Sequence, residues 1–275
     1  MIRRGLRIFG IALVLARYRL DELLLELPPL KIARVVRLIP WGRRRVRELS
    51  RGARLRLALE ELGPIYVKFG QILSTRRDLL PADIADELAE LQDAVPPFPG
   101  ERAREIVEKE LGQPIDALYA RFDTEPMASA SIAQVHGAQL HDGRDVVVKV
   151  VRPGIEARVR EDLELLGALA RLARRYHPEG DRIRPNEVVD EFEAVIVEEL
   201  DMQREGANAS LLRRNFEYSD ELYIPEIHWS HTADRVLTME RIGGVPVRDI
   251  DELKRQGVNL ERLARRGIRV FYQQV

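Results

Sequence analysis

The chain has 275 residues, of which 45% are hydrophobic and 32% are charged, a composition typical of a folded protein with long solvated helices rather than of a disordered chain. It contains no cysteine, which excludes disulfides, thiolate metal sites and a cysteine nucleophile. Aromatic residues make up only 6% of the chain, which argues against recognition of single-stranded nucleic acid by base stacking.

Charge is distributed unevenly along the chain. The net charge is -1, but residues 1–57 hold 15 Lys and Arg against 4 Asp and Glu, a net charge of +11, so the remainder carries -12. A basic block on an acidic body predicts an anionic partner for the block, either a membrane surface or nucleic acid. We favour the membrane surface and expect no nucleic acid, because the block is leucine-rich and has no recognised nucleic-acid-binding motif.

The basic block, residues 1–57, has the pattern of interfacial helices. Its longest apolar run, Ile8 to Ala16, has 9 residues and is too short to span a bilayer. Arginines flank this run on both sides and no small-residue cleavage motif follows it, which excludes a secretory signal peptide. Apolar residues alternate with arginine, and Trp41 lies beside Arg43 to Arg45, a pattern typical of helices in the headgroup region. Alternatively, these helices pack on the body and their arginines form a solvated face.

Residues 58–125 have a helical pattern without strand-like alternation. In LGPIYVKFGQILSTRRDLLP, residues 62–81, Pro64 suits the first turn of a helix. Apolar residues recur there at helical spacing: Leu62, Ile65, Phe69 and Ile72. Lys68 and Gln71 lie three residues apart on the other side, where they form either a solvated face or part of a site completed elsewhere. A linker, VPPFPG, then precedes a helix that ends at Gly112.

The periodicity changes in MASASIAQVHGAQLHDGRDVVVKVV, residues 127–151. Two β-rich runs flank a turn at Asp142-Gly143, which is a strong hairpin signal. The later pattern predicts a helix over Ile155 to Tyr176, one long helix from about Glu187 to Phe216, two strands within residues 223–244, and a last helix that runs to the end. This order is that of a kinase-type N-terminal lobe. We therefore predict an α+β fold: a small antiparallel sheet with a long helix, preceded by a helical extension.

Lys149 is the sharpest functional signal. It lies in VVVKVV, a run apolar enough to be buried on both faces, where its charge requires a partner. The alternative is a lysine on an edge strand that points to water. Asp201 and Glu205 lie one turn apart on one predicted helix face, so either carboxylate could meet Lys149. In kinases the corresponding strand lysine holds the nucleotide phosphates and is oriented by a helix glutamate.

Two further segments fit a nucleotide site. Small residues occupy the position of a kinase glycine-rich loop, where they let backbone N–H groups approach phosphates: Ala128, Ser129, Ala130 and Ser131. A turn without glycine is stiffer, because it cannot use positive φ cheaply. MERIGG, residues 239–244, fits a kinase hinge, in which backbone groups around Glu240 and Ile242 would bind the adenine edge. Alternatively, it is a strand that runs into a turn.

In this order the motifs resemble the UbiB family of atypical, protein-kinase-like proteins linked to ubiquinone biosynthesis, over nearly the whole chain from YRLDELL to FYQQV. Five family motifs stand here as Lys68-Phe69-Gly70-Gln71, ASASIAQVH from Ala128, Lys149, Glu199-Leu200-Asp201 and Glu205. The resemblance implies that Lys68 reaches the acidic pair at 199 and 201, that Gln71 lines the nucleotide cleft, and that Glu205 orients Lys149.

The resemblance also implies a function: an ATP- or ADP-binding ATPase or phosphotransferase that supports ubiquinone biosynthesis, peripheral on the cytoplasmic face of the bacterial inner membrane. Other quinone-biosynthesis proteins are its expected partners. The alternative is a non-catalytic, membrane-associated scaffold of a quinone-biosynthesis assembly.

The resemblance divides the chain into membrane-facing helices (1–57), a helical extension (58–125), a kinase-like lobe with its hinge (126–246) and the start of a second lobe (247–275). The catalytic loop and the Mg²⁺ ligands are expected beyond Val275, so we expect a truncated chain that hydrolyses no ATP at a useful rate. His228 and His231 alone do not make a zinc site, and we predict no metal ligands within the chain.

Overall fold

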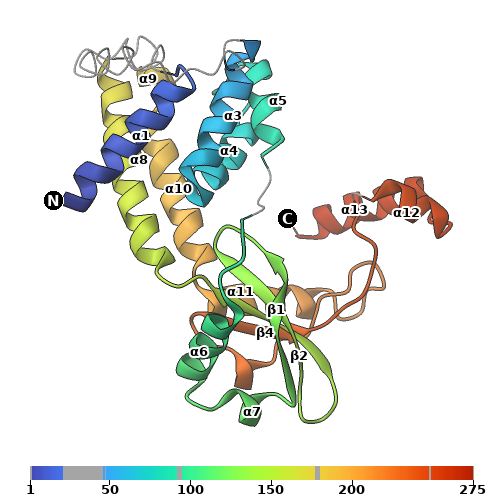
Figure 1. Ribbon diagram of the computed structural model, residues 1–275. Coiled ribbons are helices and arrows are strands. Elements are labelled where there is room, and N and C mark those ends of the chain that lie inside the picture. The colour runs from blue at the N-terminus through green and yellow to red at the C-terminus, as the bar shows by residue number, and fades with distance from the viewer. Residues whose placement is uncertain are drawn as a thin grey trace. The chain divides into compact units, whose positions relative to one another are not determined.

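The computed structural model describes residues 2–20, 46, 48–91, 95–176, 180–247 and 249–274 (Figure 1). The chain forms two compact units from interleaved segments. The first unit comprises residues 1–97, 129–133 and 152–200, and the second comprises residues 98–128, 134–151 and 201–275. The four linear domain ranges expected from the sequence stay a prediction.

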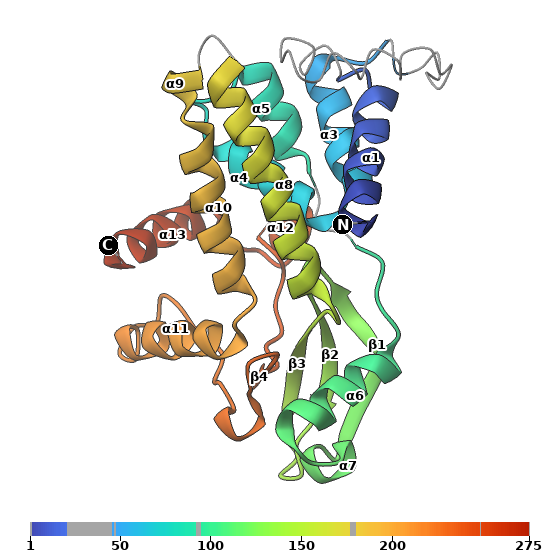
Figure 2. The same ribbon diagram turned by 90° about the vertical axis from the view of Figure 1, so that its left-hand side faces the viewer.

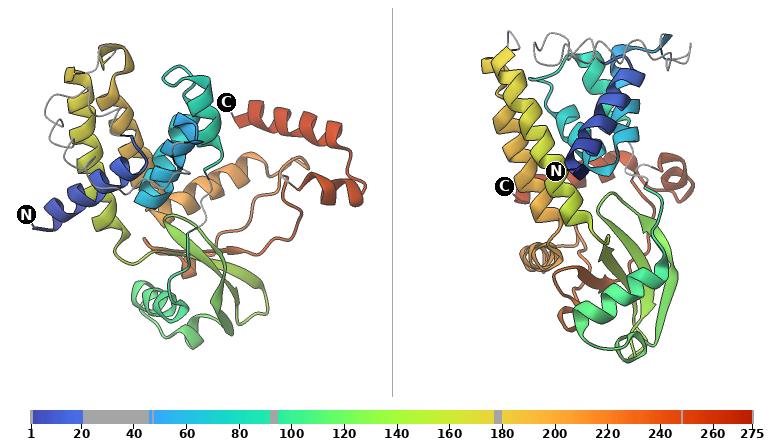
Figure 3. Two further views of the ribbon diagram at one scale, coloured as in Figure 1. Left: turned by 45° about the horizontal axis from the view of Figure 1, so that its top comes forward. Right: turned by 60° about the vertical axis from the view of Figure 1, so that its left-hand side comes forward.

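The first unit is helical. Its helices are α1 (Ile2–Arg17), α3 (Arg51–Leu62), α4 (Pro64–Thr75), α5 (Ala82–Ala89), α8 (Ile155–Tyr176), α9 (Gly180–Ile183) and α10 (Pro185–Glu199). Helices α3, α4 and α5 pack on one another (Figure 3), and α8 runs alongside α10 (Figure 2). Of the apolar positions predicted within residues 62–81, Leu62 and Ile65 are buried, and Phe69 and Ile72 are half-buried.

The amphipathic pattern over residues 62–81 is longer than the helix that forms there, because α4 covers only Pro64–Thr75. Gly63 has φ 111°, a backbone conformation that favours glycine, and it separates α3 from α4. Pro64 opens α4 in the first turn, as predicted, where its missing N–H needs no partner. Leu62 therefore belongs to α3, and Lys68 and Gln71 both lie on the short helix α4.

The second unit contains the sheet. Its elements are α6 (Gly100–Leu111), α7 (Ile115–Leu118), β1 (Arg121–Ser129), β2 (Ala133–Gln139), β3 (Asp145–Val151), α11 (Met202–Asn215), η3 (Trp229–His231), β4 (Val236–Glu240), α12 (Ile250–Arg255) and α13 (Leu260–Gln274). The strand order is β1-β2-β3-β4, and β3 pairs antiparallel with β4. Short connections between β1, β2 and β3 require antiparallel neighbours there as well. The α+β class predicted from the sequence is confirmed.

The core of the second unit lies between the sheet and α6. Helix α6 packs on β3 and β4 (Figure 2). Val146, Val148 and Val150 of β3 are fully buried together with Val107 of α6. Because side chains alternate along a strand, Lys149 projects from the opposite face of β3. The strand is thus buried on one face and only partly covered on the other, whereas the sequence indicated burial on both faces.

Two of the strand predictions were wrong. The chain was expected to be helical through residue 125, but β1 begins at Arg121. This strand was missed because it is an edge strand that carries Pro126 and charged residues and is largely exposed, so it lacks an apolar alternation. After residue 222 the described chain has one strand of the sheet, β4, and not two. Ile227 makes only an isolated bridge with Met239.

The long helix predicted from Glu187 to Phe216 is also wrong, because two helices occupy this range. Helix α10 ends at Glu199, and α11 begins at Met202. Between them Asp201 leaves the helical conformation and accepts a hydrogen bond from the Arg204 N–H at 2.9 Å. Aspartate at this position satisfies one of the orphan N–H groups of the new helix, and so favours a fresh start over continuation. The chain passes from the first unit to the second at this break.

The predicted interfacial helices fall mostly on residues 21–45 and 47, with Trp41 and Arg43 to Arg45, which lie outside the described residues. None of the helices that the structure describes is long and apolar enough to cross a bilayer. Within α1, Ile11 is buried and Arg7 forms an ion pair with Asp162 of α8 at 2.9 Å. This part of the basic block therefore packs on the first unit, as the alternative interpretation proposed.

Candidate functional site

The ammonium group of Lys149 is paired with a single carboxylate. Its Nζ donates to Oε1 of Glu205 at 2.9 Å and to Oε2 at 2.7 Å. The Lys149 side chain is 27% exposed and that of Glu205 is 37% exposed. Because β3 lies between β2 and β4, the edge-strand alternative for Lys149 is excluded. Of the two candidate partners, the structure selects Glu205, and the Asp201 carboxylate instead caps α11.

Helix α11 holds Glu205 in place by packing closely on β4. The next residue, Gly206, is buried, and a Cβ added there would lie 3.1 Å from Leu237 Cδ1 and 3.2 Å from the Trp229 ring. Leu237 is the residue of β4 that stands opposite Lys149 in the ladder. Glycine thus permits the helix approach that brings Glu205 to Lys149. In the sequence, this close approach could have been recognised from a glycine inside a helical pattern, directly after the glutamate.

The pair has the chemistry of an anion-binding group. An ammonium group carries three hydrogens, and Glu205 accepts two of them, so Lys149 can donate its third to a phosphate oxygen. Partial exposure leaves the group accessible to a ligand from solvent. The carboxylate limits the conformational freedom of the long lysine side chain, and so pre-organises the donor.

The predicted hinge segment leaves the end of β4. The carboxylate of Glu240 accepts from the Tyr223 hydroxyl at 2.7 and 2.6 Å, and this hydrogen bond lowers the pKa of Glu240. The Glu240 N–H donates to the Glu226 carbonyl at 2.9 Å. Because this N–H group already has a partner, the adenine contact predicted around Glu240 would have to use other backbone groups of the segment. Ile242 lies in irregular chain beyond β4 and is exposed.

The alanine-rich segment comprises the end of β1, at Ala128 and Ser129, and the start of its connection to β2. Ala128 and Ala130 are exposed, Ser129 is half-buried, and Ser131 is buried. The Ala130 N–H donates to the Ala133 carbonyl at 2.9 Å and closes a tight turn without glycine. A backbone turn therefore occupies the position predicted for the phosphate-binding loop.

A buried polar network follows this turn, and sequence reasoning missed it. Gln134 binds the backbone of Phe98 in both directions, accepting from its N–H at 3.1 Å and donating to its carbonyl at 3.3 Å. This arrangement fixes the orientation of the amide, whose nitrogen then donates to His136 Nε2 at 2.8 Å. His136 Nδ1 donates to the Asp123 carbonyl at 2.8 Å. His136 is thus held neutral, and burial lowers its pKa. The sequence assigned it no role, because one histidine in a strand carries no pattern.

The buried imidazole predicts a loss of stability in mild acid. Because the folded state has the lower His136 pKa, below the ordinary value of 6.5 the unfolded chain binds a proton that the folded chain does not. Stability should therefore fall as the pH is lowered from 7 toward 5, with a slope of at most about 1.4 kcal/mol per pH unit from this one proton. Urea unfolding at several pH values measures this slope.

The matched variant is His136→Asn, which retains a side-chain amide donor but has no proton to gain in this range. It should be less stable than the wild type at pH 7 and should show a flatter pH dependence between 7 and 5. Equal slopes for the two proteins would contradict the assignment of a neutral buried imidazole.

In the first unit, the lysine and glutamine of α4 have different partners. Lys68 Nζ lies 2.7 Å from Oε1 of Glu199, at the end of α10, with side chains 22% and 34% exposed. Gln71 Nε2 donates to the Leu91 carbonyl at 3.1 Å. Lys68 therefore contacts Glu199 of the acidic pair at 199 and 201, whereas the Asp201 side chain caps α11. Gln71 binds backbone within its own unit, and the cleft contact implied for it stays a prediction.

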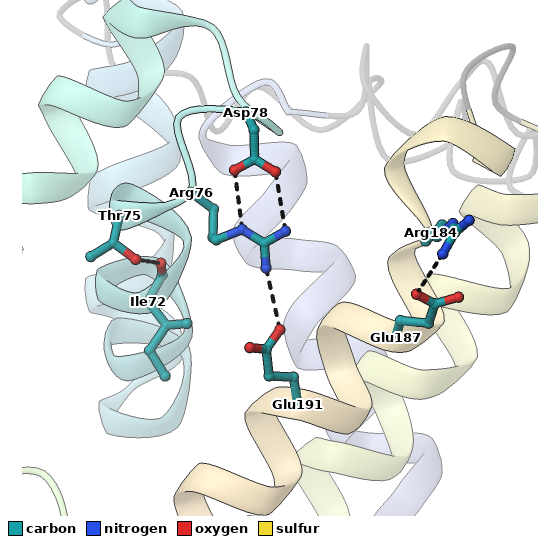
Figure 4. Close-up of polar contacts among 7 residues, drawn as sticks. All are labelled: Ile72, Thr75, Arg76, Asp78, Arg184, Glu187 and Glu191. Atoms are coloured by element: carbon teal, nitrogen blue, oxygen red, sulfur yellow. Dashed lines mark hydrogen bonds and ion pairs between the residues drawn. The ribbon is translucent and has the colours of Figure 1, made fainter. Parts of the chain in front are cut away.

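Three side-chain contacts join α4 and Arg76, the residue directly after it, to α10 in antiparallel order. Besides Lys68 and Glu199, the rings of Phe69 and Phe192 meet edge to face at 5.1 Å. Figure 4 shows the third contact, in which Arg76 binds both carboxylate oxygens of Asp78 and reaches Glu191 at 3.2 Å. No local pattern indicates this role of Arg76, because its contact with Glu191 joins segments 115 positions apart in the chain. Each exposed pair contributes little alone, and together they fix the register of the helices.

Within the part of the chain that the structure describes, no group of three or more His, Cys, Asp and Glu side chains is placed to hold a metal ion. His228 donates its backbone N–H to the Thr238 carbonyl, and His231 contacts the Leu118 carbonyl through Nε2. Both histidines therefore serve the fold of the second unit.

Comparison with known proteins places these motifs in a family. The ABC1 atypical kinase-like domain matches residues 90–275. Proteins named "Probable protein kinase UbiB" are similar over nearly the whole chain. That of Marinobacter nauticus is 57% identical over 98% of this chain and 49% of its own length. That of Xanthomonas oryzae pv. oryzae is 56% identical over 98% of this chain and 50% of its own length. The chain thus spans about half the length of the curated relatives it matches.

A solved structure, "The complex structure of Rv3197-erythromycin from Mycobacterium tuberculosis", is 28% identical, with a TM-score of 0.47 over 70% of this chain and 49% of that chain. The family assignment rests on the sequence matches and not on this overlay. The resemblance inferred from the five motifs is confirmed, and the chain belongs to the family of ABC1 atypical kinase-like domains that includes the UbiB proteins.

Proposed function

We propose that the chain binds ATP or ADP and that Lys149, oriented by Glu205, donates to the phosphates. The observation that carries this proposal is the lysine–glutamate pair on a central strand of a kinase-like sheet, half-exposed and with one donor beyond those that Glu205 uses. The kinase-like family supports it, because phosphoryl-transfer folds of this class place such a pair at the nucleotide phosphates.

The other predicted contacts complete this proposal. The turn from Ala128 to Ser131 would present backbone N–H groups to phosphates, and backbone at Ile242 would contact the adenine edge. Mg²⁺ would accompany the nucleotide and neutralise its phosphate charge. The family motifs also predict four further members of the site, which are Lys68, Gln71, Glu199 and Asp201.

For the whole protein we propose an ATPase or phosphotransferase that supports ubiquinone biosynthesis, peripheral on the cytoplasmic face of the bacterial inner membrane. The relatives named as probable protein kinases support the reaction class. The net charge of +11 in residues 1–57 supports an anionic membrane surface as partner. Other quinone-biosynthesis proteins are further proposed partners.

Calorimetric titration with Mg²⁺–ADP and Mg²⁺–ATP tests nucleotide binding. We expect the wild-type chain to bind and Lys149→Ala to bind at least about tenfold more weakly, which corresponds to about 1.4 kcal/mol. Lys109→Ala is the matched control, because Lys109 is an exposed lysine on α6 of the same unit. It should bind as the wild type does.

Two results would contradict the proposal. The first is a wild-type chain that binds neither nucleotide, which would favour a non-catalytic scaffold in which the Lys149–Glu205 pair is structural. The second is equal affinity in Lys149→Ala and Lys109→Ala. Circular dichroism of each variant separates loss of binding from loss of fold.

A further inference from the structure

The outer edge of β4 ends in an incomplete backbone pair. The Glu240 N–H donates to the Glu226 carbonyl at 2.9 Å, which is one half of the exchange that two antiparallel residues usually make. The other half is replaced, because the Glu226 N–H donates to Oε2 of the Glu240 side chain at 3.2 Å. The carboxylate of Glu240 thus takes the place of its own backbone carbonyl as the partner of Glu226.

The Glu240 carbonyl points away from β3. The next N–H, that of Arg241, donates to the Asp145 carbonyl at the start of β3 at 3.1 Å. In a trans peptide the carbonyl oxygen and the following N–H point in opposite directions, so the Glu240 carbonyl faces the outer side of β4. Within the part of the chain that the structure describes, no hydrogen bond reaches this carbonyl. It is therefore an open backbone acceptor.

This acceptor lies where the chain leaves the sheet. Glu240 is the last residue of β4 and is half-buried, and the segment that follows it, Arg241 to Gly244, is exposed. Ile242 in this segment is the other residue of the predicted adenine contact, and it is 52% exposed. A ligand can therefore reach this edge from solvent.

Two side chains hold the carboxylate of Glu240 in its position. The Tyr223 hydroxyl donates to both carboxylate oxygens, at 2.7 and 2.6 Å. Arg213 lies with its Cζ 5.6 Å from the centre of the Tyr223 ring and its Nη1 3.9 Å from Oε2 of Glu240. An ionised carboxylate only accepts hydrogen bonds, so it competes with the carbonyl for the Glu226 N–H. All of these residues belong to the second unit.

We propose that Glu240 determines base specificity through its carboxylate, which occupies the Glu226 N–H and so leaves the Glu240 carbonyl free to accept from the exocyclic amino group of adenine. The inference rests on the proposed nucleotide binding and adds to it the selection of the base. The hypoxanthine of IDP carries an oxygen in place of that amino group. It is disfavoured, because two acceptors cannot form a hydrogen bond with each other.

Calorimetric titration with Mg²⁺–ADP and Mg²⁺–IDP tests this selection, because the two nucleotides differ in the base and share the phosphates. The wild-type chain should bind ADP at least about tenfold more tightly than IDP. In Glu240→Leu the released Glu226 N–H should pair with the Glu240 carbonyl. ADP binding should then weaken by about fivefold, as expected for one neutral hydrogen bond, while IDP binding stays unchanged. Glu217→Leu, at an exposed glutamate of the same unit, is the matched control and should keep the wild-type preference.

Three further variants separate selection of the base from phosphate binding. Glu240→Gln retains an acceptor oxygen, so it should keep most of the preference for ADP. Tyr223→Phe removes the hydroxyl that holds the carboxylate, and should lower the preference by about twofold. Tyr223 is 59% exposed, so this variant carries the test even if Glu240→Leu does not fold. Lys149→Ala should weaken ADP and IDP binding by the same factor, because it acts on the shared phosphates.

The outcomes are distinguishable. An unchanged preference in Glu240→Leu and Tyr223→Phe overturns the inference and leaves the proposed nucleotide binding intact, as does a wild-type chain that binds ADP and IDP equally. An equal loss in Glu240→Gln and Glu240→Leu overturns the role given to the acceptor oxygen. A wild-type chain that binds neither nucleotide overturns the proposed function and this inference together.

Discussion

Replacing Arg7 by methionine should lower the free energy of unfolding by about 3–5 kcal/mol, the cost of leaving a buried carboxylate without its partner. Arg7 binds both oxygens of Asp162, at 2.9 and 3.0 Å. Asp162 is only 1% exposed and also accepts from the Tyr66 hydroxyl at 3.4 Å. Burial raises the pKa of Tyr66, with a further contribution from the Asp162 carboxylate, so this hydroxyl stays protonated as a donor. Urea unfolding followed by circular dichroism measures the change.

Arg17→Met is the matched control on the same helix. Arg17 forms an ion pair with Glu61 in which the side chains are 39% and 30% exposed, and such surface pairs contribute at most about 1 kcal/mol. The double variant Arg7→Met with Asp162→Leu removes both charges, and should be more stable than Arg7→Met alone. If Arg7→Met lowers the free energy of unfolding no more than Arg17→Met does, then α1 does not bury the Asp162 carboxylate, which would contradict the packing of α1 on α8.

Substituting Gly100 by alanine should destabilise the second unit by about 3 kcal/mol. A Cβ at this position would overlap the carbonyl oxygen of Thr124 and lie 2.6 Å from its carbonyl carbon. Both atoms belong to the backbone of β1, so no side-chain rotation relieves the overlap, and α6 or the strand must shift. Without such an overlap, alanine stabilises a helix relative to glycine by about 1 kcal/mol, so a loss of stability in Gly100→Ala would show that α6 lies this close to β1.

Gly112 at the other end of α6 is the matched control. It has φ 68° and caps the helix in the left-handed conformation, but no atom lies within 4 Å of the Cβ that alanine would add. Gly112→Ala should therefore cost only about 1 kcal/mol, from backbone strain alone. Thermal unfolding of the two variants compares the effects directly. Equal losses at both positions would show that a Cβ at residue 100 meets no steric overlap and that α6 does not press on β1.

The sequence by itself determined the elements whose signals are local. The helix from Ile155 to Tyr176 was predicted with both of its ends, and the Asp142-Gly143 hairpin lies between β2 and β3 as expected. Gly143 there adopts φ 89°, which the turn requires. The apolar context of Lys149 also indicated that its charge needs a partner, since a charge among valines is costly alone.

Only the tertiary structure decided which groups meet. Helical spacing alone left Asp201 and Glu205 equal as partners of Lys149, and the family resemblance implied Glu205. The structure gives the reason: Asp201 caps a new helix, and Gly206 lets that helix approach β4. The ion pair of Arg7 with Asp162 spans 155 positions along the chain, and no pattern indicated it. Periodicity reports the local face on which a residue lies. Partners depend on how distant segments pack, and that packing minimises buried unpaired charge over the whole fold.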